Sequence, residues 1–144
     1  MTHSSTISAL LPLALPADSD RRQLLLTFRR MALHGLDDAH ATWAMIERFG
    51  LGYHTPLVLM RRFLSELASV SLRPISMAPC CCPRMTLDEA RLLSVVARAN
   101  AEPDWARFHL ERLTGGAGAS QPLSVAMALN DTLAERGRPL PLSG

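Results

Sequence analysis

Three consecutive cysteines, Cys80, Cys81 and Cys82, carry the most reactive side chains of this sequence. Pro79 and Pro83 enclose them, and proline on both sides predicts a tight turn or an extended segment rather than a helix. Thiolates bind zinc and act as nucleophiles, whereas protonated cysteines are small apolar side chains that are often buried. The turn is therefore consistent with a metal site, with a reactive thiol or with a structural plug.

Zinc is the metal that such a turn would bind, but the spacing of the cysteines suits it poorly. Cys80 and Cys82 are separated by one residue, whereas zinc knuckles leave two or more residues between paired ligands. The remaining ligands would come from His34, His40 or His54, which are distant in sequence and have no metal-type spacing of their own. A zinc site is thus one alternative, and no other cofactor is assigned.

A reactive thiol is the second alternative for the turn. The cysteines precede Thr86, the expected start of a helix, and Arg84 lies between them and this start. The positive end of a helix dipole and a nearby cation both lower the pKa of a thiol. The sequence has no C-x-x-C motif, however, and therefore gives no thioredoxin-like redox site.

Other patterns for catalysis or DNA binding are weak. No serine lies in a nucleophile elbow, and no glycine pattern forms a phosphate loop. Asp37 and Asp38 precede a predicted helix, with Asp37 expected as the N-cap and Asp38 in the first turn. Two arginine pairs suggest a helix-turn-helix motif, but the link between the helices concerned is longer than usual. DNA binding is therefore only a third alternative.

Hydrophobic periodicity and helix punctuation predict the elements that position these residues. The predicted helices span about 19–33, 37–49, 55–70, 86–99, 103–114 and 121–136. Leu and Ala are abundant while Val, Ile and Tyr are few, which favours helix over sheet. The predicted fold class is an all-α, single-domain orthogonal bundle of five or six helices, with a short extended segment that carries the cysteines.

Two helices are expected to form most of the core. The apolar stripe of helix 55–70 covers close to half of its circumference, which predicts a central helix with Leu64 in the core and Arg61 outside. Thr86-Leu87-Asp88-Glu89 is a capping box at the start of the next, strongly apolar helix. Trp43 is expected to be buried by the second helix.

The segment between these two helices is predicted to run back across the body of the domain. Arg73-Pro74 ends the long helix, and residues 72–79 are expected to be extended or irregular. Their return direction leads toward the end of the first helix. We therefore predict that at least one cysteine lies close to His34 or His40.

Length and composition predict one globular domain. The chain has 144 residues, of which 48% are hydrophobic and 19% are charged. We expect an extended N-terminal arm over 1–17, a helical domain over 18–137 and a C-terminal tail over 138–144. All 15 basic residues are arginine, but a net charge of +2 argues against nucleic-acid binding.

The expected location is the cytoplasm. No apolar run approaches the length of a membrane span, so no membrane partner is predicted. Prolines interrupt the apolar stretch 7–17 and no basic residue precedes it, which favours an arm over a signal peptide. Three adjacent cysteines form no intramolecular disulfide framework, which fits a reducing compartment.

Three strings of residues resemble a small bacterial protein family of unknown function. They are PCCCPRMT at 79–86, HGLDDAH at 34–40 and Arg73-Pro74-Ile75. The resemblance runs from about Pro16 to Ala99, and loosely to the Gly-Arg-Pro-Leu string near the C-terminus. It implies one domain, and it implies no activity and no catalytic residues.

The leading hypothesis is a non-enzymatic cytoplasmic protein that binds a partner protein or a small molecule. Its rival is a thiol or zinc site at the cysteine turn. The residues of that site would be Cys80, Cys81, Cys82, Arg84, His34 and His40. Solvent exposure of a cysteine sulfur, and its distance from an imidazole, distinguish the two hypotheses.

Overall fold

The structure is a computed structural model that describes residues 13–79 and 81–142. Its helices are α2 (Ser19–His34), α3 (Ala39–Phe49), the 3-10 helix η1 (Gly50–Tyr53), α4 (His54–Val70), α5 (Leu87–Arg98), α6 (Pro103–Thr114) and α7 (Ser120–Glu135). The short strands β1 (Leu13–Ala14) and β2 (Arg84–Met85) pair antiparallel. The predicted all-α fold is confirmed, and each predicted helix is present with small shifts at its ends.

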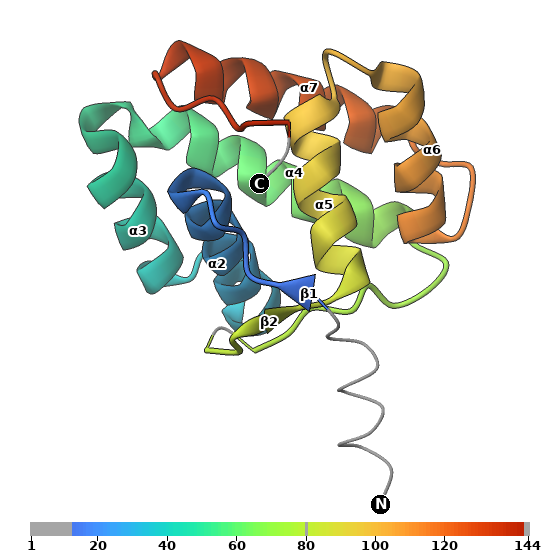
Figure 1. Cartoon of the computed structure of the whole chain (residues 1–144), viewed down its shortest axis with the longest axis horizontal. Helices are drawn as coiled ribbons and strands as arrows, with labels where there is room; N and C mark the ends of the chain where they lie inside the picture. The colour runs from blue at the N-terminus through green and yellow to red at the C-terminus, as the bar shows by residue number, and fades with distance from the viewer. Residues whose placement is uncertain (1–12, 80, 143–144) are drawn as a thin grey trace, which may run out of the picture.

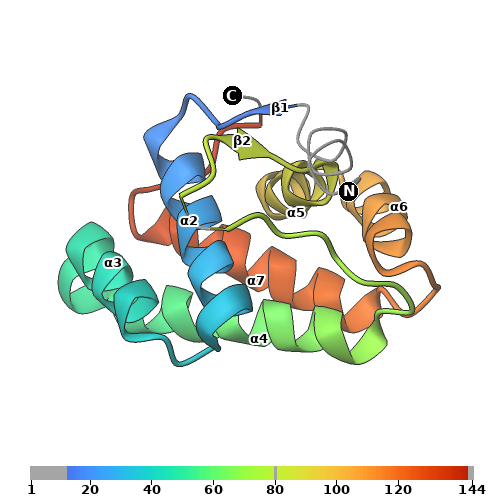
Figure 2. The same cartoon turned by 90° about the horizontal axis from the view of Figure 1, so that it is seen from below.

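The helices form two layers that cross at a steep angle. α4 packs lengthwise against α7, and these two helices form one layer (Figure 2). α2, α5 and α6 run across this layer, and α3 lies at one edge beside α2 (Figure 1). The apolar faces of both layers meet between them, as the predicted orthogonal bundle requires. None of the described helices combines the length and the apolar character needed to cross a membrane.

The centre of the core is an aromatic contact between the layers. The rings of Phe28 in α2 and Phe63 in α4 are both fully buried, and their centroids are 6.0 Å apart. Met60 and Leu67 continue the same buried face of α4, which confirms that this helix is central. Leu64 is only partly buried, so its predicted place in the core is wrong. The buried face is centred one residue earlier, on Phe63.

Two further predictions about side-chain exposure are wrong. Trp43 is 60% exposed, because α3 lies at the edge of the bundle and buries only Ala41 and Met45. Arg61 does not lie on an outer face of α4. Its Nε donates to the carbonyl oxygen of Leu36 at 2.9 Å, so Arg61 fixes the link between α2 and α3.

The predicted N-cap of α3 is also wrong, and α4 and α7 begin without a side-chain cap. Asp38, not Asp37, is the N-cap of α3, since its carboxylate accepts a hydrogen bond of 2.9 Å from the Ala41 backbone N–H. Thr55 lies inside α4, because η1 leads into this helix without a side-chain cap. Ser120 is the first residue of α7 and makes no cap hydrogen bond.

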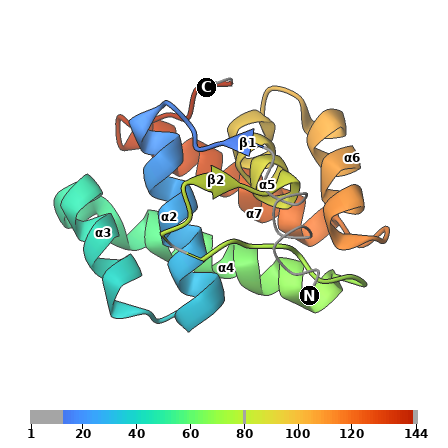
Figure 3. The ribbon, with the colours of Figure 1, turned by 60° about the horizontal axis from the view of Figure 1, so that its bottom comes forward.

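The segment after α4 returns across the body of the domain, as predicted. Figures 2 and 3 show it running from the end of α4 to α2 before β2 begins. β2 then pairs with β1, with Leu13 opposite Met85. Residues 1–12 of the predicted arm lie outside the described residues, so the limits of arm, domain and tail stay predictions. Within the tail, Leu140 is buried against the core.

Candidate functional site

A buried ion pair between α2 and α5 lies beneath the cysteine turn. The side chains of Arg29 and Glu89 are fully buried, and Arg29 donates Nε to Oε2 at 2.7 Å and Nη2 to Oε1 at 2.9 Å. Glu89 also accepts from the backbone N–H of Thr86 at 2.9 Å, while Thr86 Oγ1 accepts from the Glu89 N–H at 2.9 Å. This reciprocal pair confirms the predicted capping box.

The remaining donors of Arg29 bind the backbone of the turn. Nη1 donates to the carbonyl oxygen of Cys82 at 3.0 Å, and Nη2 donates to that of Arg84 at 2.7 Å. The backbone N–H of Ala78 donates to Glu89 at 3.1 Å. A buried charge is tolerated only when it is paired and fully hydrogen-bonded, and these contacts meet that condition. The turn is therefore attached to the core through its backbone.

A second ion pair fixes the segment that precedes the turn. Arg73 Nη2 donates to Asp88 Oδ1 at 2.9 Å, and the Ser76 N–H donates to Asp88 Oδ2 at 2.8 Å. Thr86 Oγ1 donates to the carbonyl oxygen of Ser76 at 2.7 Å. The residues at the start of α5 thus bind an extended segment as well as the helix terminus. Arg73, Cys82, Arg84 and Thr86 from the Arg73-Pro74-Ile75 and PCCCPRMT strings take part in these contacts.

The described cysteine side chains lie at the surface. Cys81 is exposed and Cys82 is partly exposed. Cys80 lies outside the described residues. Because the side chain of Cys81 faces solvent, it does not fill the turn as an apolar plug.

His34 and His40 lie at the end of α2 and the start of α3. His40 Nδ1 is 2.9 Å from Arg30 Nη2, and Arg30 also donates to both oxygens of Asp38 at 3.0 and 3.1 Å. These hydrogen bonds lower the pKa of Asp38 to about 2. Arg29 and Arg30 are successive helix residues and point to different faces of α2.

The zinc hypothesis gains no support from this arrangement. Within 13–79 and 81–142, no group of three or more His, Cys, Asp or Glu side chains is arranged as a metal site. The turn is bound at Arg29, whereas His40 is bound at Arg30 on another face of the helix. The expected approach of a cysteine to His34 or His40 stays a prediction.

An apolar groove of about 730 Å³ opens between the end of α2, the second half of α4 and the segment that follows it. Met31, Leu67 and Leu92 form its buried floor. Ile75 and Met77 line one wall and are partly buried. The groove therefore leaves a continuous apolar surface open to solvent.

The polar groups of the groove are few. Ser65, Ser71 and Arg73 are the polar residues of its lining. Ser71 Oγ donates to the carbonyl oxygen of Leu67 at 2.7 Å, and Arg73 is bound to Asp88. The groove thus offers a ligand mainly apolar contacts.

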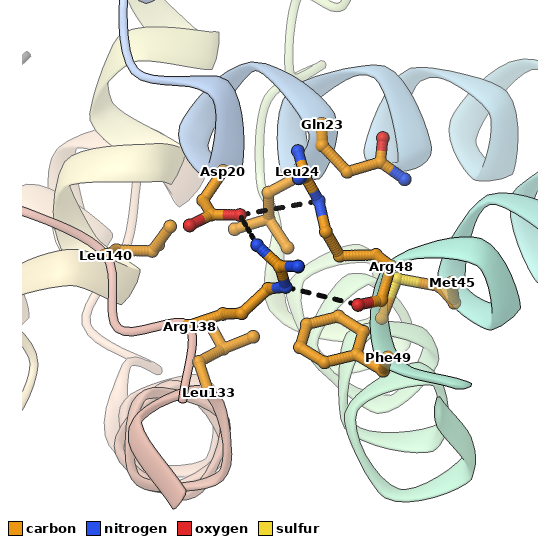
Figure 4. Close-up of a pocket in the computed structure, with 9 residues that line it drawn as sticks. All are labelled: Asp20, Gln23, Leu24, Met45, Arg48, Phe49, Leu133, Arg138 and Leu140. Carbon is orange, nitrogen blue, oxygen red and sulfur yellow. Dashed lines mark hydrogen bonds and ion pairs between the residues drawn. The ribbon is translucent and has the colours of Figure 1, made fainter. Parts of the chain in front are cut away.

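A smaller cavity, on the other side of α2, is too small for a ligand. Its volume is about 10 Å³, which is about the space of one water molecule. Asp20 lies here between Arg48 and Arg138, 3.4 and 3.5 Å from their guanidinium nitrogens (Figure 4). Arg138 Nε also donates to the carbonyl oxygen of Arg48 at 3.1 Å. This cluster joins α2, α3 and the C-terminal tail, and its purpose is structural.

The sequence prediction missed both Arg29 and the groove. Arg29 follows Leu25 by four residues and therefore shares the apolar face of α2, which was the signal for its burial. The groove had no comparable signal, because three separate elements form it.

Comparison with known proteins gives a family and no function. Residues 1–138 match a protein family that is described as a family of unknown function (DUF6628). This range includes the groove and the cysteine turn. No curated protein and no solved structure gives a significant match.

Proposed function

Because the chain belongs to DUF6628, a family of unknown function, we propose a function from the structure: the protein binds a small apolar molecule in the groove between α2 and α4. The observation that carries this proposal is the open apolar surface of the groove. The proposal takes up the small-molecule part of the leading hypothesis, a non-enzymatic binding protein, and the apolar lining of the groove supports it.

The size and lining of the groove support a small ligand. Its volume of about 730 Å³ lies within the range of roughly 300–1,000 Å³ that is typical of small-molecule sites. Met31 and Met77 line it, and methionine side chains adapt to ligands of irregular shape. The few polar groups at its edge suit a ligand with one polar end.

The length of the groove argues against a partner helix. At 1.5 Å per residue, the α4 wall from Leu64 to Ser71 is about 10 Å long. Anchors at i, i+3, i+4 and i+7 of a docked helix also span about 10 Å, so such a helix would fill this whole wall and extend beyond it at both ends. A compact molecule therefore fits the groove better.

Titration with Nile red, a neutral apolar dye, tests the proposal. We expect its fluorescence to rise and shift to the blue on addition of the full-length protein, and dodecanol to reverse the change. Ala68→Trp places a large ring into the groove and is expected to weaken dye binding by about ten-fold or more.

Ser69→Trp is the matched control. Ser69 is the next residue of α4, is exposed and does not line the groove. This variant should bind the dye as the wild type does. Equal losses in both variants, or no binding by the wild type, would contradict the proposal. Tight binding of an amphipathic helical peptide instead of dodecanol would point to a partner protein.

Thiol chemistry at Cys81 is a second candidate function, supported by the exposure of this side chain. An exposed thiol stays reduced in a reducing compartment such as the cytoplasm. We propose that the protein acts there. The turn backbone is held by Arg29, so the side chain is presented from a fixed position.

Alkylation with iodoacetamide tests the accessibility of Cys81. We expect the native protein to be modified at this residue at a rate within about ten-fold of that in urea, because an exposed thiol needs no unfolding to react. Mass spectrometry of the intact protein should show one fewer native modification for Cys81→Ser. Protection of Cys81 until the protein unfolds would rule out thiol chemistry at this site.

A further inference from the structure

The apolar groove has one charged side chain in its described lining, and that side chain is a cation. Arg73 lines the groove and is 38% exposed, whereas none of the other described residues of the lining carries a charge. Its partner Asp88 is only 5% exposed and does not belong to the lining. A molecule in the groove therefore meets the guanidinium of Arg73 more readily than the carboxylate of Asp88.

The ion pair with Asp88 does not neutralise this end of the groove. Asp88 Oδ1 lies 2.9 Å from Arg73 Nη2 and also 3.7 Å from Arg91 Nη1. Two guanidinium groups and one carboxylate together carry a net charge of +1. An anion is therefore attracted to this place.

The helix ends nearby do not cancel this charge. α4 and α6 both end close to Arg73, and the carbonyl oxygens at a helix C-terminus carry partial negative charge. The N–H and Oγ of Ser71 donate to the carbonyl oxygen of Leu67 at 2.9 and 2.7 Å, and Arg73 Nη1 donates to that of Leu113 at 2.9 Å. Because these oxygens already accept hydrogen bonds, they repel an anion less.

Arg73 lies at one end of the groove, so the charged and the apolar parts of the lining are separate. The groove follows α4 from Leu64 to Ser71. Leu64 is beside α2, because its neighbour Phe63 contacts Phe28 of that helix. Arg73 follows Ser71 by two residues, and Figure 2 shows this end of α4 away from α2. An amphiphilic molecule would therefore bind in one direction.

We propose that the ligand of the groove is an aliphatic carboxylate, with its carboxylate group at Arg73 and its chain toward Met31 and Leu36. This inference rests on the proposed function, since it names the class of molecule that binds in the same groove. A carboxylate suits the net positive end better than a neutral head group does. A phosphate suits it less well, because Arg73 Nη1 and Nη2 already donate to Asp88 and a phosphate needs several donors.

Displacement of Nile red by dodecanoate and by dodecanol tests the head group at constant chain length. At neutral pH and low ionic strength, below the concentration at which dodecanoate forms micelles, we expect dodecanoate to bind the full-length protein about five-fold more tightly. This preference should decrease when sodium chloride is added, because salt screens the attraction. Equal affinities would overturn the inference and leave the proposed function standing. Displacement by neither molecule would overturn both.

Variants at the charged end locate the carboxylate. Arg73→Gln should remove the preference for dodecanoate, but it leaves Asp88 without its closest partner and can fail to fold. Leu72→Glu keeps this ion pair, and Leu72 is 79% exposed and lines the groove. It should weaken dodecanoate binding by about five-fold relative to Leu72→Gln, its uncharged control, and leave dodecanol binding equal in the two variants. Equal dodecanoate binding by these two variants would contradict a carboxylate at Arg73.

Ala32→Glu is the matched control at the other end of the groove. Ala32 is exposed and lines the groove beside α2. A charge here lies beside the aliphatic chain, so it should weaken dodecanoate and dodecanol alike and keep the preference for dodecanoate. If Ala32→Glu removed this preference and Leu72→Glu did not, the carboxylate would bind at the α2 end and the assignment to Arg73 would be wrong.

Discussion

Replacing Arg29 by alanine is expected to lower the free energy of unfolding by about 3–5 kcal/mol, because Glu89 then remains as a buried charge without its partner. The same change leaves the carbonyl oxygens of Cys82 and Arg84 without the guanidinium that binds them. Urea unfolding followed by far-UV circular dichroism measures the loss.

Arg62→Ala is the control for this prediction. Arg62 is 62% exposed and forms an ion pair with Glu66 at 3.3 Å on the surface of α4. Its removal should cost less than about 1 kcal/mol, since exposed ion pairs contribute little. If Arg29→Ala were as mild as this variant, the buried ion pair would not be the support of the cysteine turn.

Phe63→Ala is expected to lower the free energy of unfolding by about 3–5 kcal/mol as well, through a different cause. Phe63 is fully buried between the two helix layers and contacts the ring of Phe28. Its truncation leaves a cavity that the crossing helices cannot close without moving apart from their other contacts. Chemical unfolding monitored by circular dichroism gives the value.

The neighbouring residue provides the comparison for Phe63. Leu64 is partly exposed on the groove, so water or a ligand can occupy the space that Leu64→Ala opens. This variant should therefore cost clearly less than Phe63→Ala. Equal costs would place Leu64 in the core, where the sequence alone had put it.

The features that the sequence predicted well depend on short stretches of chain. The capping box at Thr86 needs only four residues, and its geometry is present as expected. The break at Arg73-Pro74 also acts locally, so the end of the long helix and the return of the extended segment were predictable.

The features that the sequence missed depend on which elements meet. The sequence predicted a buried Trp43, but none of the described elements covers this edge of the bundle, and the side chain is exposed. The burial of Arg29 was missed, because its partner Glu89 is 60 residues away. The groove combines several elements, and a single helix wheel does not show it.

The ion pair of Arg29 has a consequence for how the cysteine turn can move. The turn is short and rich in proline, and such segments often open by local fluctuation. Here its backbone is bonded to Arg29, and Arg29 is bonded to Glu89 at the start of α5. If the turn detached, the buried guanidinium of Arg29 would lose the carbonyl oxygens of Cys82 and Arg84 as acceptors, which raises the free-energy cost of opening the turn. The most reactive segment of the chain is thus attached to the core, and the Cys82 amide, which donates to the carbonyl oxygen of Pro79, should be protected from hydrogen exchange.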